Sequence, residues 1–185
     1  MCFLSIGAGG HLGPSILSAF NSDPHSAVSI LARHSHQCVF SSHLKIYRVG
    51  DDYPEAELLE AFEGQDAVIS SVATASVGIQ KRLIDAAVEM GVKRFVPSEF
   101  GGDTRNEKAV GVFPQYFKGK VDIVAYLKEK EKGNEGFAWT AFVTGPHFDL
   151  QACLTSMFEQ KLIIHQSDDN RIYGHQLERA ESYNI

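Results

Sequence analysis

Short apolar segments alternate with amphipathic ones along most of this chain, and this alternation limits the possible folds more than any other feature. Runs typical of buried strands occupy residues 2–6, 27–32, 44–49, 67–72, 94–97 and 137–143. Apolar side chains recur at three- and four-residue spacing, as in helices with one buried face, in residues 11–20, 55–62, 77–90 and 115–130. This alternation predicts an α/β fold, a doubly wound parallel sheet with helices on both faces.

The pattern weakens towards the carboxyl end of the chain. A long segment after residue 98 shows no clear period, and we expect it to be irregular as far as the helix at residue 115. Residues 148–162 favour one more helix, and residues 161–165 a short strand. Residues 165–185 are polar and aperiodic, so we expect no regular structure in them.

Composition argues against several classes of protein. The 185 residues carry a net charge of −6, and basic residues are adjacent only in pairs, which argues against binding to nucleic acid or to an anionic membrane. No apolar stretch approaches the roughly 18 residues of a membrane span. The three cysteines, Cys2, Cys38 and Cys153, lack the spacing of a metal site or a disulfide framework. We therefore expect a cytoplasmic protein without a metal site.

A glycine-rich turn separates the first strand from the first helix. It consists of Gly7, Ala8, Gly9, Gly10, His11, Leu12 and Gly13. Glycines let the backbone turn sharply and approach a pyrophosphate, and the following helix directs free N–H groups at the phosphates. Such a turn also allows a helix to pack closely on a sheet, but its place between a strand and a helix favours dinucleotide binding.

The residue at the end of the second strand predicts which dinucleotide is bound. An acidic side chain there accepts a hydrogen bond from the ribose 2′-hydroxyl of NAD, whereas a cation binds the 2′-phosphate of NADP. The residue is Arg33, and no acidic residue occurs between Asp23 and Asp51. We therefore expect NADP (NADPH) as the cofactor. The alternative is that Arg33 is a solvated loop residue.

Further segments carry a more specific signal. They are Gly50–Asp51 and residues 66–71, 92–101, 117–121 and 136–149, with Pro-Ser-Glu-Phe-Gly at residues 97–101 the most diagnostic. Together with the glycine turn and Arg33, they resemble the NmrA-like, isoflavone-reductase-like branch of the short-chain dehydrogenase superfamily, over roughly residues 2–165. The resemblance implies a Rossmann-type NAD(P)-binding fold. It also implies an NADPH-dependent oxidoreductase that transfers hydride to a small aromatic substrate.

The resemblance implies which residues carry the chemistry. Reductases of this family use a lysine on the helix after the Pro-Ser-Glu-Phe-Gly loop to orient the nicotinamide ribose and to move a proton. The matching residue is Lys120, with Lys118 as a rival, and burial would make the lysine proton labile near neutrality. Tyr116 completes the Tyr-x-x-x-Lys spacing of the wider superfamily, in which the tyrosine is the acid. That spacing also arises by chance on helices.

The other expected site residues lie in loops that follow the strands. For the cofactor they are Ser71, Val72, Ala73, Pro97 and Ser98, and for the substrate they are Glu99, Phe100, His147 and Phe148. Glu99 has an alternative role, which is to order its loop by accepting backbone N–H bonds. His147 either faces the substrate or is a surface residue.

Members of the resembled family continue well past residue 185, and their later segments build much of the substrate pocket. We therefore expect an NAD(P)-binding domain in residues 1–150, the start of a substrate-binding region in 151–165 and an unmatched tail in 166–185. Most of the small C-terminal substrate region would be missing. Two alternatives to an active reductase stay open: a non-catalytic NAD(P)-sensing regulatory protein of the NmrA type, with a protein partner, and an inactive truncated fragment.

Overall fold

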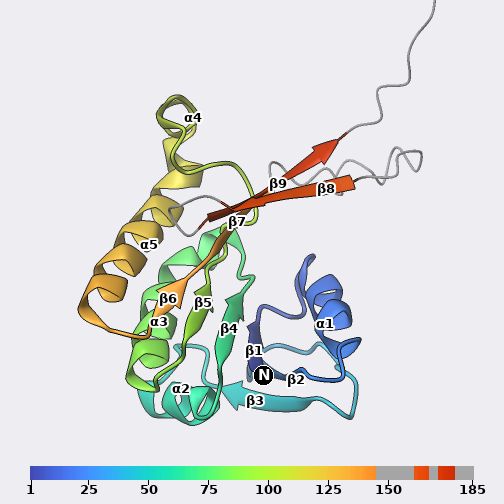
Figure 1. Cartoon of the computed structure of the whole chain (residues 1–185). Helices are drawn as coiled ribbons and strands as arrows, with labels where there is room; N and C mark the ends of the chain where they lie inside the picture. The colour runs from blue at the N-terminus through green and yellow to red at the C-terminus, as the bar shows by residue number, and fades with distance from the viewer. Residues whose placement is uncertain (145–160, 167–170, 178–185) are drawn as a thin grey trace, which may run out of the picture.

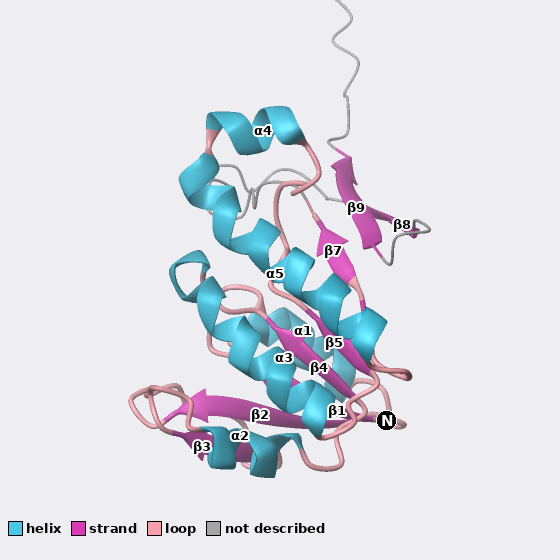
Figure 2. Cartoon of the chain, turned by 90° about the vertical axis from the view of Figure 1, so that its left-hand side faces the viewer, coloured by secondary structure: helices cyan, strands magenta, loops and turns pink. Residues whose placement is uncertain are grey.

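Six parallel strands form the central sheet of the computed structural model, which describes residues 1–144, 161–166 and 171–177 (Figures 1 and 2). The strands are β1 (Cys2–Ile6), β2 (Ala27–Arg33), β3 (Lys45–Val49), β4 (Ala67–Ser70), β5 (Arg94–Val96) and β6 (Ala138–Trp139). Their order across the sheet is β3-β2-β1-β4-β5-β6, and each neighbouring pair is parallel. The expected doubly wound α/β fold is confirmed.

Helices cover both faces of this sheet. One face carries α2 (Glu55–Phe62), α3 (Gln80–Glu89) and α5 (Pro114–Gly133), and the opposite face carries α1 (Gly13–Asn21) (Figure 1). A 3-10 helix, η1 (Thr74–Ile79), runs directly into α3. Among the described residues, no helix combines the length and the apolar character that crossing a membrane requires.

Most of the buried apolar side chains lie on the face with three helices. The largest fully buried side chains of this cluster are Trp139, Phe62 and Phe95. The smaller cluster on the α1 side consists of Ala8, Ile30 and Ala32. Leu31 of β2 belongs to the larger cluster and its neighbours Ile30 and Ala32 to the smaller one, as the two-residue period of a strand between two helical layers requires.

The predicted strand over residues 137–143 is in fact two strands in two sheets. β6 pairs with β5, whereas β7 (Ala141–Val143) pairs with β9 (Arg171–Leu177), which in turn pairs antiparallel with β8 (Lys161–Gln166). The short strand expected at 161–165 is confirmed as β8. The expectation that residues 165–185 lack regular structure is wrong for β9, because that strand is defined by its pairing with β7 and β8 rather than by an apolar pattern of its own. Residues 148–160 of the expected helix lie outside the described residues.

Two helix starts differ from the sequence prediction, and one helix was not predicted, for local reasons. The first helix begins at Gly13 rather than at residue 11, with proline in its first turn. η1 replaces the start of the helix expected from residue 77. The segment expected to be irregular contains α4 (Glu107–Val112), where the Asn106 side chain accepts a hydrogen bond from the Ala109 amide at 3.1 Å. This helix is too short to show a period, and only its cap residue signals it.

Candidate functional site

The strand order reverses between β1 and β4, and the loops after these two strands therefore lie on either side of a crevice at the carboxyl edge of the sheet. In parallel sheets of this kind, ligands bind in that crevice. The glycine turn follows β1, and Ser71, Val72 and Ala73 follow β4. The topology thus places two of the expected cofactor segments next to each other.

The glycine turn approaches the loop after β4 too closely for a side chain. Gly7 has a φ of 82°, and a Cβ atom on it would lie 2.6 Å from the carbonyl oxygen of Ser71. The Gly10 amide donates to the Gly7 carbonyl at 2.9 Å, which closes the turn. At the start of α1, Leu12 provides no side-chain cap. The turn and the first turn of α1 therefore offer backbone groups, and not side chains, to whatever lies in the crevice.

Arg33 lies exposed at the end of β2, as predicted. Arg48 of β3 donates hydrogen bonds to the carbonyl oxygens of Arg33 at 3.1 Å and His36 at 2.6 Å, so the following loop is held in place. The Asp51 carboxylate accepts a hydrogen bond from the Ser35 amide at 3.3 Å. Hydrogen bonding from Ser35 lowers the pKa of Asp51, and the charge of Arg33 acts in the same direction.

This arrangement corrects one part of the sequence argument for NADP. No acidic residue is close to Arg33 along the chain, but β3 pairs with β2 and ends beside it, which brings Asp51 into the same neighbourhood. The separation between Asp23 and Asp51 in sequence therefore does not measure the charge around Arg33. The cation at the strand end is still present, together with an acidic neighbour that the sequence argument missed.

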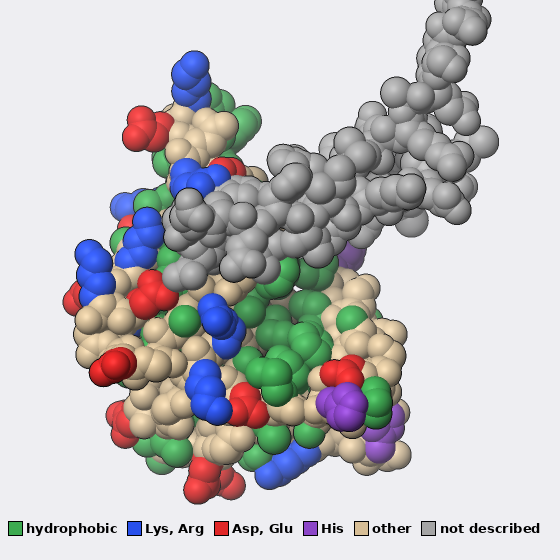
Figure 3. Space-filling model, viewed as in Figure 1, with side chains coloured by type: hydrophobic (Ala, Val, Ile, Leu, Met, Phe, Trp, Pro, Cys, Tyr) green, Lys and Arg blue, Asp and Glu red, His purple; other side chains and the backbone are tan. Residues whose placement is uncertain are grey.

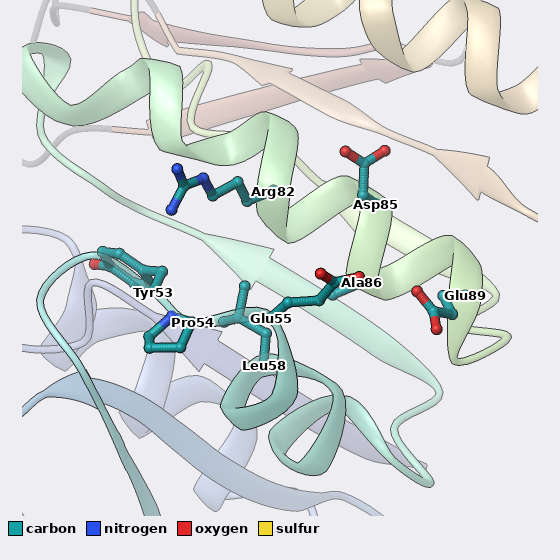
Figure 4. A pocket seen from close by; sticks show the side chains of 8 residues that line it. All are labelled: Tyr53, Pro54, Glu55, Leu58, Arg82, Asp85, Ala86 and Glu89. Carbon is teal, nitrogen blue, oxygen red and sulfur yellow. The ribbon is translucent and has the colours of Figure 1, made fainter.

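A cavity of about 490 Å³ opens beside Arg33. Its polar lining comes from Arg33, Asp51, Asp52, Ser76 and Arg82. A second cavity, of about 440 Å³, lies between α2 and α3, and Figure 4 shows the residues that line it. The two cavities share Tyr53 and Arg82, and the Arg82 guanidinium donates a hydrogen bond to the Asp52 carbonyl. The first cavity is lined by Arg33 at the end of β2 and by Asp51 after β3, where the adenosine end of a dinucleotide is held in this fold.

Gln80 joins the loops after β4 and β5, and the sequence analysis missed it. Its buried amide oxygen accepts a hydrogen bond from the Ser98 backbone amide at 2.8 Å, while the Ser98 hydroxyl donates to the Val72 carbonyl at 2.8 Å. Gln80 falls at helical spacing with Leu83 and Ile84 on the buried face of α3. The sequence signal that could have identified Gln80 is its position as a polar residue on an apolar helix face. These two bonds fix Ser98, next to Pro97, at the edge of the crevice.

Lys120 of α5 is buried, with 4% of its surface exposed, whereas its rival Lys118 is exposed. The Lys120 ammonium donates a hydrogen bond to the backbone carbonyl of Glu99. Burial lowers the pKa of Lys120, and the negative charge of Glu99 partly opposes that effect. Burial thus shifts the pKa of Lys120 in the direction that a labile proton needs.

Tyr116 lies on the same side of α5 as Lys120. The Lys120 Nζ atom is 5.5 Å from the centre of the Tyr116 ring. A Cβ atom on Gly101 would lie 3.1 Å from the Tyr116 hydroxyl and 3.2 Å from Lys120 Nζ. Gly101 therefore borders both groups, and the loop after β5 meets the Tyr-x-x-x-Lys pair at this point.

The structure describes two of the four expected substrate residues, Glu99 and Phe100. Glu99 is 1% exposed, and its carboxylate accepts a hydrogen bond from the Thr104 hydroxyl at 3.0 Å, so its side chain is turned into the protein. The Phe100 ring stacks on Phe142 of β7, with 5.9 Å between ring centres. His147 and Phe148 lie outside the described residues. In the part of the chain that the structure describes, no group of three His, Cys, Asp or Glu residues could hold a metal ion.

The strand order, the two helical layers and the glycine turn at the switch point define a Rossmann-type α/β domain. Solved structures share this fold. The complex of leucoanthocyanidin reductase with NADPH from Vitis vinifera has a TM-score of 0.61 at 24% identity, over 78% of this chain and 48% of that chain. A crystal structure of isoflavone reductase has a TM-score of 0.66 at 22% identity, over 84% of this chain and 54% of that chain.

The chain belongs to the NmrA-like family, whose sequence model matches residues 3–172. Oxidoreductase aprR of Aspergillus flavus is 52% identical over 145 residues, which make up 78% of this chain and 48% of that protein. The isoflavone reductase homolog IRL of Zea mays is 51% identical over 75 residues, or 40% of this chain and 24% of that protein. The chain spans about half or less of these curated relatives. The resemblance identified from the motifs is confirmed.

Proposed function

We propose that this chain is the cofactor-binding part of an NADPH-dependent oxidoreductase that reduces a small aromatic compound by hydride transfer. The observation that carries the proposal is the buried Lys120, held at the carboxyl edge of the sheet beside Gly101 and Tyr116. A buried lysine at this edge of the sheet is suited to proton transfer beside a bound dinucleotide. The names of the relatives, an oxidoreductase and an isoflavone reductase homolog, support the same reaction class.

The residues around the crevice fit a dinucleotide. Because a Cβ atom at Gly7 would lie 2.6 Å from the Ser71 carbonyl oxygen, only glycine allows the turn to lie this close to the loop after β4. Residues 7–13 would hold the pyrophosphate with backbone groups, and Arg33 would bind the 2′-phosphate beside the cavity of about 490 Å³. Ser71, Val72, Ala73, Pro97 and Ser98 would border the nicotinamide. NADPH, when bound, supplies the hydride.

Lys120 would bind the nicotinamide ribose and move a proton. Its lowered pKa makes the neutral amine more accessible than that of a surface lysine, so it can exchange a proton at its Nζ atom. Tyr116 is the alternative proton donor, because its hydroxyl also borders Gly101. The two assignments differ in the variant that loses turnover, which is a Lys120 variant if the lysine moves the proton and a Tyr116 variant if the tyrosine does.

The substrate would lie next to Phe100, whose stacking on Phe142 provides a flat apolar wall for an aromatic ring. His147 and Phe148 would complete this side. In this proposal, residues 1–150 form the cofactor-binding domain and residues 151–165 begin the substrate-binding region. A regulatory NAD(P)-sensing role with a protein partner is the second candidate, because the chain covers 48% of the aprR protein and such a role needs only the cofactor half.

Turnover by Lys120→Ala separates these functions, with Lys118→Ala as the matched control on the exposed side of the same helix. We expect Lys120→Ala to lose NADPH oxidation with an aromatic substrate panel and to keep NADPH binding. Lys118→Ala should retain both. Unchanged turnover in Lys120→Ala would contradict the proposed role of the lysine, and NADPH binding without any turnover in the unmodified chain would favour the regulatory role.

A further inference from the structure

The Lys120 ammonium group lies in the protein interior, where burying a charge costs free energy. Its side chain is 4% exposed, and moving a charged amine out of water is unfavourable unless an opposite charge or hydrogen bonds compensate. One of its hydrogen bonds goes to the Glu99 carbonyl. A carbonyl oxygen is a neutral acceptor, so it satisfies a donor but does not balance the charge.

Glu99 supplies both kinds of compensation from one residue. Its backbone carbonyl accepts from Lys120, and its own carboxylate is the charge that acts on Lys120 against the effect of burial. This carboxylate is 1% exposed and accepts a hydrogen bond from the Thr104 hydroxyl at 3.0 Å. The hydrogen bond from Lys120 to the Glu99 carbonyl thus joins loop and helix, 21 residues apart in sequence, and brings the buried acidic residue to the lysine.

The other charged groups near this loop do not provide that charge. Asp103 pairs with Arg105 at 3.0 Å on the more exposed part of the loop. On α5, Asp122 and Lys118 are exposed, and Tyr116 is the remaining titratable group that borders Lys120. The carboxylate of Glu99 is therefore the buried acid that the described residues bring to Lys120.

We propose that Glu99 is a positioning residue whose buried carboxylate, anchored by Thr104, offsets part of the cost of burying the Lys120 ammonium and directs it at the crevice beside Gly101. This inference rests on the proposed function for the purpose of the lysine, but the pairing itself is a property of the folded chain. It assigns Glu99 a role through Lys120, in place of contact with a substrate. The 1% exposure of Glu99 is consistent with that change of role.

The test is a direct titration of Lys120 in the cofactor-free full chain. The carbon-13 shift of the lysine Cε atoms is followed against pH by NMR, and the Lys120 signal is assigned by its absence from Lys120→Met. Glu99→Gln keeps the shape of the side chain and removes its charge. We expect it to lower the Lys120 titration midpoint by about one to three pH units relative to wild type. Glu99→Asp, which restores the charge, should return the midpoint towards the wild-type value.

Asp122→Asn is the matched control, because it removes an exposed acid two positions from Lys120. Its Lys120 midpoint should equal that of wild type. An unchanged Lys120 midpoint in folded Glu99→Gln, or an equal shift in Asp122→Asn, would overturn the proposal. If Glu99→Gln does not fold, Lys120→Met carries the test: loss of the ammonium should move the titration of the Glu99 carboxyl carbon to higher pH, and no movement would overturn the proposal.

NADPH binding, measured separately on the same proteins, keeps the two proposals apart. A lowered Lys120 midpoint in Glu99→Gln supports the charge pairing whether or not the chain binds NADPH. Absence of NADPH binding in wild type would contradict the proposed function alone.

Discussion

Gly7→Ala tests the close approach of the glycine turn to the loop after β4, and Gly64→Ala is its matched control. Both glycines have positive φ angles, 82° and 71°, so each substitution adds the strain of a left-handed residue, about 1–2 kcal/mol. Only at Gly7 does the new Cβ atom meet backbone, 2.6 Å from the Ser71 carbonyl oxygen, whereas nothing lies within 4 Å at Gly64. The clash adds about 1–3 kcal/mol.

We therefore expect Gly64→Ala to lose about 1–2 kcal/mol of unfolding free energy and Gly7→Ala about 2–5 kcal/mol. Urea unfolding measures both. The single tryptophan, Trp139, is 1% exposed and reports loss of the core by fluorescence. Gly7→Ala should also abolish NADPH binding in calorimetry, and Gly64→Ala should preserve it. Equal losses of stability in the two variants, or intact NADPH binding by Gly7→Ala, would refute this account of the turn.

Three further predictions address the loops and the charges. Gln80→Leu leaves the Ser98 amide without its acceptor and should reduce the unfolding free energy by about 1–3 kcal/mol in urea, with a loss of NADPH affinity; unaltered stability would show that Gln80 does not hold the loop. Burial lowers the pKa of Lys120 in the folded state below 10.5, its value in the unfolded state. At a pH between the folded and unfolded pKa values the unfolded state binds more protons, so the unfolding free energy of wild type rises with pH there. The rise is about 1.4 kcal/mol for each unit that separates the two pKa values, and Lys120→Met should lack it. Parallel curves of unfolding free energy against pH for wild type and Lys120→Met would contradict the shift. Asp51→Asn removes an acid beside Arg33 and should tighten NADPH binding more than NADH binding at low salt, and an identical effect on both cofactors would place the 2′-phosphate elsewhere.

The sequence was sufficient where one local pattern determines one structure. The glycine turn, the strand ending at Arg33 and the helix that carries Lys120 all follow from periodicity and turn chemistry within about 20 residues. The family resemblance added the expected role of Lys120, which no local pattern contains. Burial then distinguishes Lys120 from Lys118, and the packing of α5 produces that difference.

Apart from the short helices α4 and η1, the features that sequence reasoning missed depend on contacts between distant segments. Asp51 reaches the neighbourhood of Arg33 only because β3 pairs with β2, and Gln80 acts through a loop 18 residues further on. β9 is a strand because of its partners β7 and β8. In each case the deciding interaction is hydrogen bonding between segments that are distant in sequence, and the apolar pattern does not identify the partner.

Calorimetric titration of the purified chain with NADPH and, separately, with NADH tests the central claim most directly. We expect NADPH to bind with a dissociation constant at least about tenfold lower than that of NADH, which corresponds to about 1.4 kcal/mol from the contact of Arg33 with the 2′-phosphate. Arg33→Ala should remove most of that difference. Binding of neither dinucleotide would contradict the assignment of the glycine turn and the crevice as a cofactor site, and equal binding of both would contradict the role of Arg33.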